Sequence, residues 1–160
     1  MELLEGNLYF IKNDFFKEMN DINLMLNHGE KSNRPLYLAI KDKNIIWLIP
    51  LSSKVDKYKK IINNRKSTYG KCDSIIIEKI LGKESAILIQ NTFPCNKIYI
   101  DHCYLTNDGK KAHIPIKTQK RIKTKLEILF SLKKKGINLF MSDIDLMIEK
   151  IENCKTLQYV

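Results

Sequence analysis

The chain has 160 residues and a net charge of +10, and it is 44% hydrophobic and 29% charged, which is the composition of a basic globular domain. No stretch approaches the roughly 20 apolar residues of a membrane-spanning helix. The opening residues, MELLEGNLYF, also lack the basic segment and long apolar run of a secretory signal peptide. We therefore expect one domain, residues 1–160, in the cytoplasm.

A strand and a helix are predicted first. Residues 8–12 (LYFIK) favour a short strand because they are rich in apolar and aromatic side chains. Asn13 or Asp14 is placed to cap the helix that follows. The apolar residues of this helix, Ile22 among them, suit one buried face, and Gly29 is expected to end it.

A β-hairpin is predicted next. Residues 36–41 and 45–51 are apolar runs joined by the tight turn DKN. From residue 54 to about residue 63 the spacing of the apolar side chains is helical. Residues 68–73 (TYGKCD) then predict a loop.

The middle of the chain is rich in β-strand signals. Residues 74–81 and 86–90 predict a second hairpin across the segment GKES. Residues 97–105 alternate between polar and apolar side chains, and a TNDG turn leads from them into a strand at residues 112–116.

Two helices are predicted at the end of the chain. Thr118 is placed to cap a long basic helix over residues 119–135, and Ser142 or Asp143 to cap a helix that runs to residue 154. We therefore predict an α+β fold with about six strands and about four helices. Its sheet is expected to be strongly curved and mostly antiparallel, or to form a half-open barrel.

The positive charge is concentrated in two segments. Residues 52–71 contain seven Lys or Arg and one acid, and residues 110–135 contain ten and one, whereas residues 142–160 contain four acids and two bases. Clustered cations favour a polyanionic partner such as RNA. The alternative is a small basic structural protein, because 25 of the 28 cations are lysines, a bias that AT-rich coding also produces. The predicted RNA-binding residues are Lys57, Lys59, Lys60, Lys120, Arg121, Lys123 and Lys125.

The four cysteines form no CxxC pair and are expected to be reduced thiols: Cys72, Cys95, Cys103 and Cys154. Together with His102 and His113, Cys95 and Cys103 have the ligand types of a zinc site. Neighbouring residues of a strand point to opposite faces, however, so His102 and Cys103 are poorly placed to share one ion. No metal site and no cofactor is predicted.

Two serines and a lysine lie where the predicted hairpin gives way to a helix. Ser53, with Asp56 three residues later, fits an approximate capping box, a purely structural role. That role leaves Ser52, Lys54 and Lys57 unexplained beside a helix N-terminus, which attracts anions. These surplus polar side chains indicate a phosphate-binding site.

Arg34 is predicted to lie near the same place. In a hairpin the start of one strand meets the end of its partner, so pairing residues 36–41 with 45–50 brings Arg34 towards Ser52 and Ser53. The alternative is that Arg34 is a solvated surface cation.

Several stretches of the chain resemble a known toxin family. They are NRPLYLAIKDKNIIWLIPLSSKVDKYKK, YGKCD, AILIQNTFP, YIDHCY and KKGINLFMSDI. In this order they resemble the CptN toxins of type III toxin–antitoxin systems, relatives of ToxN and AbiQ, and the likeness runs over nearly the whole chain. The most specific parts are NRP and WLIPLSSK at their particular separation.

The resemblance implies a Kid/MazF-like fold and an endoribonuclease toxin that favours adenine-rich RNA, with a role in growth arrest or phage defence. It also implies inhibition by a repeated pseudoknot antitoxin RNA in a higher-order protein–RNA assembly. The family's hydroxyl pair falls on Ser52 and Ser53, its lysine on Lys54 and its cation before the hairpin on Arg34. ToxN-like members have lysine where this chain has Arg34, and a tyrosine near the first helix is replaced by Phe15.

A ribonuclease of this kind needs no metal, because the RNA 2′-OH is the nucleophile and a 2′,3′-cyclic phosphate is the product. No DxD, HExxH or ExK set lies near the serines, which argues against a two-metal nuclease. Arg34 cannot exchange a proton at neutral pH and is expected to stabilise charge. His28 is the candidate base, although a histidine there also suits a helix C-terminus.

A non-catalytic module that binds single-stranded RNA is the alternative function. Basic strips would follow the phosphates in such a module, and aromatic side chains would stack on the bases. Tyr37, Tyr58 and Tyr69 are the candidates for stacking, but aromatic residues at strand or helix spacing also suit a core.

Overall fold

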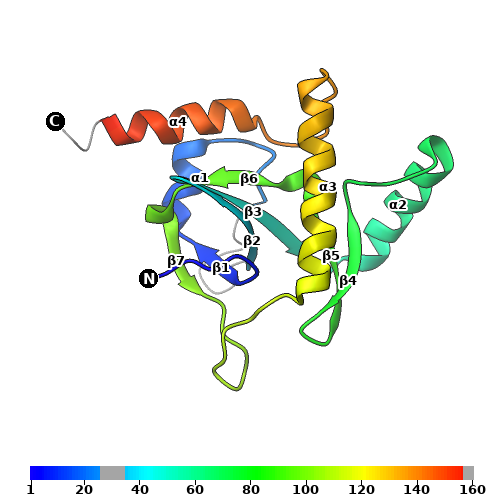
Figure 1. Cartoon of the computed structure of the whole chain (residues 1–160), viewed down its shortest axis with the longest axis horizontal. Coiled ribbons are helices and arrows are strands. Elements are labelled where there is room, and N and C mark those ends of the chain that lie inside the picture. The colour runs from blue at the N-terminus through cyan, green and yellow to red at the C-terminus, as the bar shows by residue number, and fades with distance from the viewer. Residues whose placement is uncertain (26–34, 157–160) are drawn as a thin grey trace.

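A computed structural model of the protein describes residues 1–25 and 35–156 (Figure 1). His28 and Arg34 therefore lie outside the described residues. The strands of the described part are β1 (Leu8–Ile11), β2 (Leu36–Asp42), β3 (Ile45–Ser52), β4 (Ile76–Ile80), β5 (Lys83–Ile87), β6 (Phe93–Cys95) and β7 (Ile100–Cys103). Its α-helices are α1 (Asn13–Met19), α2 (Val55–Tyr69), α3 (Ile116–Lys134) and α4 (Ile144–Thr156).

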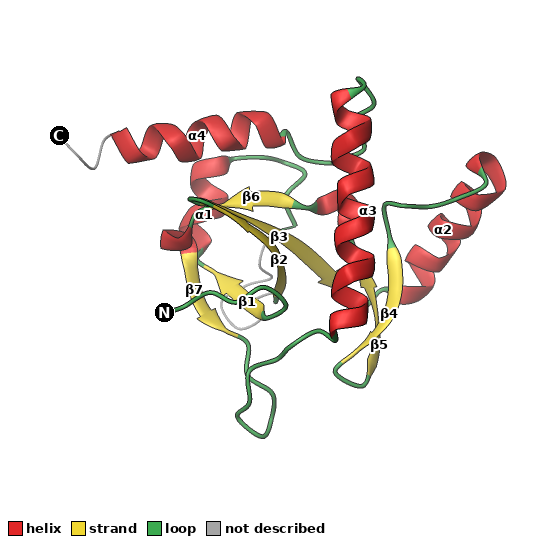
Figure 2. Ribbon diagram, viewed as in Figure 1, coloured by secondary structure: helices red, strands yellow, loops and turns green. Residues whose placement is uncertain are grey.

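The strands form one antiparallel sheet. Its order is β4-β5-β3-β2-β1-β7, and β6 pairs with β3 beside this path. The path begins at β4 and ends at β7 without closing, so the predicted curved, mostly antiparallel sheet of an α+β fold is confirmed. Figure 2 shows α3 running across the strands and α4 lying over the end of the sheet near α1.

The predicted hairpin of β2 and β3 is confirmed. Leu36 lies opposite Pro50, and Asp42 lies opposite Ile45 at the turn. The register shifts by one residue between Leu38 and Ile40, which marks a β-bulge. The beginning of β2 is thus next to the end of β3.

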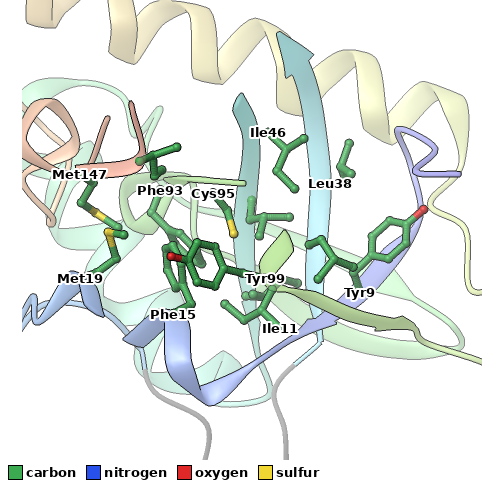
Figure 3. Close-up of a cluster of buried hydrophobic side chains, with 14 of the residues drawn as sticks. Tyr9, Ile11, Phe15, Met19, Leu38, Ile46, Phe93, Cys95, Tyr99 and Met147 are labelled. Atoms are coloured by element: carbon green, nitrogen blue, oxygen red, sulfur yellow. The ribbon is translucent and has the colours of Figure 1, made fainter. Parts of the chain in front are cut away.

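The sheet is covered on both faces, and its strands alternate accordingly. Tyr9 and Ile11 of β1 belong to a core with α1 and α4, whereas Leu8 belongs to a core with α3. Figure 3 shows the first core, where Phe15 lies at the centre near Phe93 and Tyr99. The ring centroid of Phe15 is 5.4 Å from that of Phe93 and 5.3 Å from that of Tyr99, so Phe15 is a packing residue.

Helix α1 is shorter than predicted. It ends at Met19, because Asn20 adopts a left-handed conformation (φ 47°) and donates its N–H to the carbonyl of Phe16. Ile22, predicted to be buried, is 97% exposed. Lys12 precedes the helix without a side-chain cap, so the predicted cap at Asn13 or Asp14 was wrong.

Helix α2 is longer than predicted and ends at Tyr69, where Gly70 forms a left-handed C-cap. The extra turns are polar, so the spacing of apolar residues did not reveal them. Arg65 holds this part of the helix in place, because its guanidinium donates hydrogen bonds to Ser74 and, over 2.7 Å, to Gln90. The predicted loop therefore begins only at residue 70.

The second hairpin turns earlier than predicted. Leu81 and Gly82 both have positive φ, 51° and 81°, as a two-residue turn of type I′ requires, so β5 begins at Lys83. Strand β6 was not predicted, because Pro94 lies within it and proline is uncommon inside strands. Among the described strands β6 pairs with β3 alone, so it is an edge strand, where proline is tolerated.

Two further strand predictions need correction. Residues 97–99 form a 3-10 turn, so β7 begins only at Ile100. Residues 112–116 form no strand, and His113 makes only an isolated bridge to Asn7.

Of the last two helices, only α3 starts differently than predicted. Helix α3 begins at Ile116, so Thr118 lies inside it and is not its cap. Asp143 caps α4, since its carboxylate accepts the N–H of Leu146 at 3.1 Å, as one of the two predicted alternatives requires. None of the helices in the described part of the chain is long and apolar enough to cross a membrane.

Candidate active-site cleft

A cleft of about 670 Å³ opens where β3 ends and α2 begins. Its lining comes from the start of β2, the end of β3, the β4–β5 hairpin and the loop after β7. The lining residues are Leu8, Pro35, Leu51, Ser52, Ser53, Lys54, Ile80, Leu81, Lys83, Ser85, Tyr104, Thr106 and Asn107. The structure thus brings Ser52, Ser53 and Lys54 together in one cleft.

Sheet pairing explains why distant segments meet here. Ser52, the last residue of β3, lies opposite Ala86 of β5, so the side chain of Ser85 comes to the same end of the sheet. The other wall is fixed by β1, because the carbonyl of Leu8 accepts the N–H of Tyr104 at 2.8 Å.

The two serines have different local roles. Ser52 is 8% exposed, and its Oγ accepts the backbone N–H of Lys54 at 3.3 Å. Lys54 precedes the first residue of α2, and no side chain caps this helix. The interpretation of Ser53 as a capping residue was therefore wrong, and Ser53 is instead an exposed residue of the cleft lining.

The cleft has a positive electrostatic character. Lys54 and Lys83 line it, and neither side chain is in an ion pair with a described residue. The described lining residues include no Asp or Glu. Two cations and several hydroxyl groups without a carboxylate among them suit a phosphate group, which is bound by cations and hydrogen-bond donors.

Five polar or aromatic residues of this cleft were not predicted from the sequence: Lys83, Ser85, Tyr104, Thr106 and Asn107. They lie in or next to the segments GKES and TNDG, which were interpreted only as turns. Thr106 also has a structural role, since its hydroxyl forms hydrogen bonds with the carboxylate of Asp108 and with the carbonyl of Lys110. The pairing of β5 with β3, which no local pattern encodes, is what brings Lys83 and Ser85 to the serines.

The hairpin register that predicts Arg34 near Ser52 and Ser53 is confirmed, because Leu36 lies opposite Pro50 and Pro35 lines the cleft. Arg34 and His28 themselves lie outside the described residues, so their roles stay predictions.

A second, basic groove of about 460 Å³ lies between α2, α3 and β4. Five cations line it: Lys59, Lys66, Lys71, Arg121 and Lys125. Three of these are among the predicted RNA-binding residues, so cations that are distant in the sequence come together here. Lys57, Lys60 and Lys120 are exposed on the same two helices.

Several of the predicted RNA-binding cations also have acidic partners within the protein. Lys59 pairs with Glu84 at 3.0 Å and Arg121 with Glu78 at 3.2 Å. Lys123 pairs with Glu5 and Lys125 with Asp73, each at 2.7 Å. Lys60 and Lys120 form no ion pair with any residue in the described ranges.

The ion pairs change the acidity of their carboxylates. Burial raises the pKa of Asp73, but the hydrogen bond and charge of Lys125, together with Lys71, outweigh burial and leave that pKa below its ordinary value. Burial acts likewise on Glu5, and Lys123 and the N–H of Lys41 bring its pKa below the ordinary value. Lys125 and Lys123 thus also stabilise the fold.

Two of the three tyrosines proposed for base stacking are core residues. Tyr37 is 0% exposed and Tyr58 8% exposed, whereas Tyr69 is 75% exposed at the end of α2. The stacking role suggested for Tyr37 and Tyr58 was therefore wrong.

The residues considered for zinc are dispersed. Cys95 is fully buried, His102 lies beside Asp101, and His113 bonds to Asn7 over 2.7 Å. Nowhere in residues 1–25 and 35–156 do three His, Cys, Asp or Glu side chains come together in a way that could hold a metal ion. The four cysteines are free thiols.

No protein-family model and no curated protein sequence matches the chain. Among solved structures, the fold is similar to that of AbiQ, a lactococcal anti-phage endoribonuclease of the type-III toxin–antitoxin system. The TM-score is 0.72 at 16% identity, over 94% of this chain and 98% of AbiQ. The Mycobacterium tuberculosis toxin MazF-mt6 matches with a TM-score of 0.41 at 10% identity, over 78% of this chain and 96% of the toxin. The chain thus has the fold of AbiQ, as its resemblance to the type III toxins predicted.

Proposed function

We propose that the chain is an endoribonuclease toxin that cleaves single-stranded, preferentially adenine-rich RNA in the cleft at the end of β3. The observation that carries this proposal is the meeting of Ser52, Ser53, Lys54 and Lys83 around one space without an acidic residue in its described lining. The shared fold supports the same function, since AbiQ is an endoribonuclease.

The proposed reaction is an attack of the RNA 2′-OH on the adjacent phosphorus. A base takes the 2′-OH proton, the bond from phosphorus to the 5′-oxygen breaks, and that oxygen receives a proton. A 2′,3′-cyclic phosphate and a 5′-OH end are the products. The chain must align the in-line attack and stabilise the charge on the phosphate, which needs no metal ion.

The cleft residues divide these tasks. Lys54 and Lys83 stabilise the negative charge that develops on the phosphate oxygens. Ser53, which is exposed in the cleft lining, donates a hydrogen bond to a phosphate oxygen, while Ser52 fixes the backbone at Lys54. Arg34 is proposed as a further electrostatic stabiliser. For His28 we propose the role of base.

The proposed inhibitor is a repeated antitoxin RNA that folds as a pseudoknot, occupies the cleft and is processed there. The basic groove between α2 and α3 supports such a partner, because five cations gather in it. Repeated RNA units bound to several protein copies would form a higher-order assembly, and release of the toxin would arrest growth or limit phage infection.

Incubation of the purified protein with a single-stranded adenine-rich RNA, with and without EDTA, tests the proposal. We expect cleavage under both conditions. Binding without cleavage would indicate a non-catalytic RNA-binding module. The absence of both binding and cleavage would indicate a basic structural protein. Tandem repeats followed by a terminator in the DNA immediately upstream of the gene would support the RNA antitoxin.

A further inference from the structure

We propose that Phe10, His102 and Tyr104 form a stacking platform that holds one unpaired base of the RNA beside the cleft. This inference rests on the proposed function, because it needs an RNA whose phosphates occupy the cleft. We call these three residues the platform.

The three rings lie on one face of two neighbouring strands. Phe10 of β1 pairs with His102 of β7, and side chains two residues apart share a face, so Tyr104 lies on the same side. The ring centroids of Phe10 and His102 are 4.7 Å apart, and those of Phe10 and Tyr104 are 5.7 Å apart. Phe10 thus joins the other two rings into one surface.

The platform continues the cleft. Tyr104 belongs to both, and Leu8, which is two residues from Phe10 on the same face of β1, also lines the cleft. A nucleotide strand whose phosphate lies near Ser53 and Lys54 can therefore extend along this wall, with its next base against the rings.

The platform is open to solvent, unlike most aromatic residues of this protein. The side chain of His102 is 56% exposed, and Phe10 and Tyr104 are only partly buried. The alternate residues of β1, Tyr9 and Ile11, are buried on the opposite face, while Tyr104 also packs with one side against the core that includes Leu8. Asp101 holds the imidazole in place, with 2.9 Å between its Oδ2 and Nδ1 of His102.

A base is the occupant that fits these rings best. Aromatic side chains stack on any base because every base has a π-face, and the neighbouring cationic cleft selects a polyanion. A folded protein partner would instead require a larger apolar surface, and the charged side chain of Asp101 lies against His102. Platform and cleft together therefore define a site for single-stranded RNA. The bases of a double helix are already stacked on one another and are not available to the rings.

Fluorescence of 2-aminopurine in a single-stranded, 2′-O-methylated adenine-rich RNA tests the platform, since this probe binds without being cleaved. Binding of the wild type should quench the fluorescence by stacking. Tyr104→Leu and His102→Ala should weaken binding about 5- to 100-fold and reduce the quenching, because stacking contributes that much per base. The slope of log affinity against log salt should stay unchanged, since no phosphate contact is lost.

Two control variants separate stacking from unfolding and from general surface effects. His102→Phe should keep most of the affinity, because it keeps a ring. Leu146→Ala removes an apolar side chain that is 47% exposed on α4, outside the cleft lining, and should bind as the wild type does. Wild-type affinity and quenching in both His102→Ala and Tyr104→Leu would overturn the platform alone. A wild type that binds no RNA would overturn the proposed function, and the platform with it.

Discussion

The Oγ of Ser52 accepts the backbone N–H of Lys54 at 3.3 Å, at the point where β3 turns into α2. Ser52 is almost buried, whereas the neighbouring Ser53 is exposed and caps nothing. The two adjacent hydroxyl groups therefore have separate tasks: Ser52 holds the backbone of the cleft in place, and Ser53 is free to contact a ligand.

Ser52→Ala should lower both stability and activity. Loss of one long hydrogen bond costs about 1 kcal/mol, which corresponds to a fall in Tm of roughly 2–4 °C for a chain of this size. Because Lys54 is then held less firmly, cleavage should slow on the order of 10-fold. Thermal unfolding and single-turnover cleavage measure the two effects. An unchanged cleavage rate would show that Ser52 does not position Lys54.

Lys120→Gln should weaken RNA binding without affecting the fold. Lys120 is exposed and forms no ion pair with a described residue, so its charge is available to the RNA. The slope of log affinity against log salt should become shallower by about 0.7, as for one phosphate contact of a single strand. Tm should stay the same. An unchanged slope would mean that this face of α3 does not contact RNA.

Lys125→Gln should lower stability in a pH-dependent way. Lys125 keeps the pKa of Asp73 below its ordinary value of 3.8, so their interaction stabilises the fold above that pH and is lost as the pH falls through the lower value. The variant should therefore be less stable than the wild type at about pH 7, and the difference should be smaller at about pH 3, below the ordinary pKa of Asp73.

Thermal unfolding at the two pH values measures this difference, with Lys120→Gln as the control for loss of one charge on α3. The pair Lys125–Asp73 is only partly buried, so a loss of about 1 kcal/mol is expected. The same loss at both pH values would show that Lys125 contributes by packing alone.

The chemistry of cleavage is tested on the RNA itself. Once the cut site in an adenine-rich RNA is mapped, a 2′-deoxy nucleotide at that position should abolish cleavage there, because the nucleophile is missing. The products of the unmodified RNA should carry 2′,3′-cyclic phosphate and 5′-OH ends. Products with 5′-phosphates, or cleavage of the deoxy-substituted RNA, would contradict this route.

The sequence predicted those parts of the fold that depend on local patterns. The hairpin of β2 and β3 was found because its two apolar runs flank a short turn, and its register brings Pro35 to Ser52 and Ser53. Asp143 was predicted as one of two possible caps of α4 because it directly precedes the apolar pattern of that helix.

The remaining features depend on contacts between distant segments. Strand β6 contains a proline and is a strand only because β3 lies beside it, with Trp47 opposite Pro94. Lys83 and Ser85 enter the cleft because β5 pairs with β3, not because of any motif. Phe10 and His102 meet only through the pairing of β1 with β7.

Ser53→Asp tests most directly whether the cleft at the end of β3 is the active site. Ser53 caps no helix and is exposed, so the variant should keep the wild-type Tm, while its carboxylate repels the RNA phosphate. Ser131→Asp places the same charge at an exposed position of α3 outside the cleft and serves as the control. We predict that Ser53→Asp is folded and cleaves RNA at least about 10²-fold more slowly than Ser131→Asp, as expected for loss of a transition-state contact. A folded Ser53→Asp variant that cleaves RNA at the wild-type rate would contradict the assignment of this cleft.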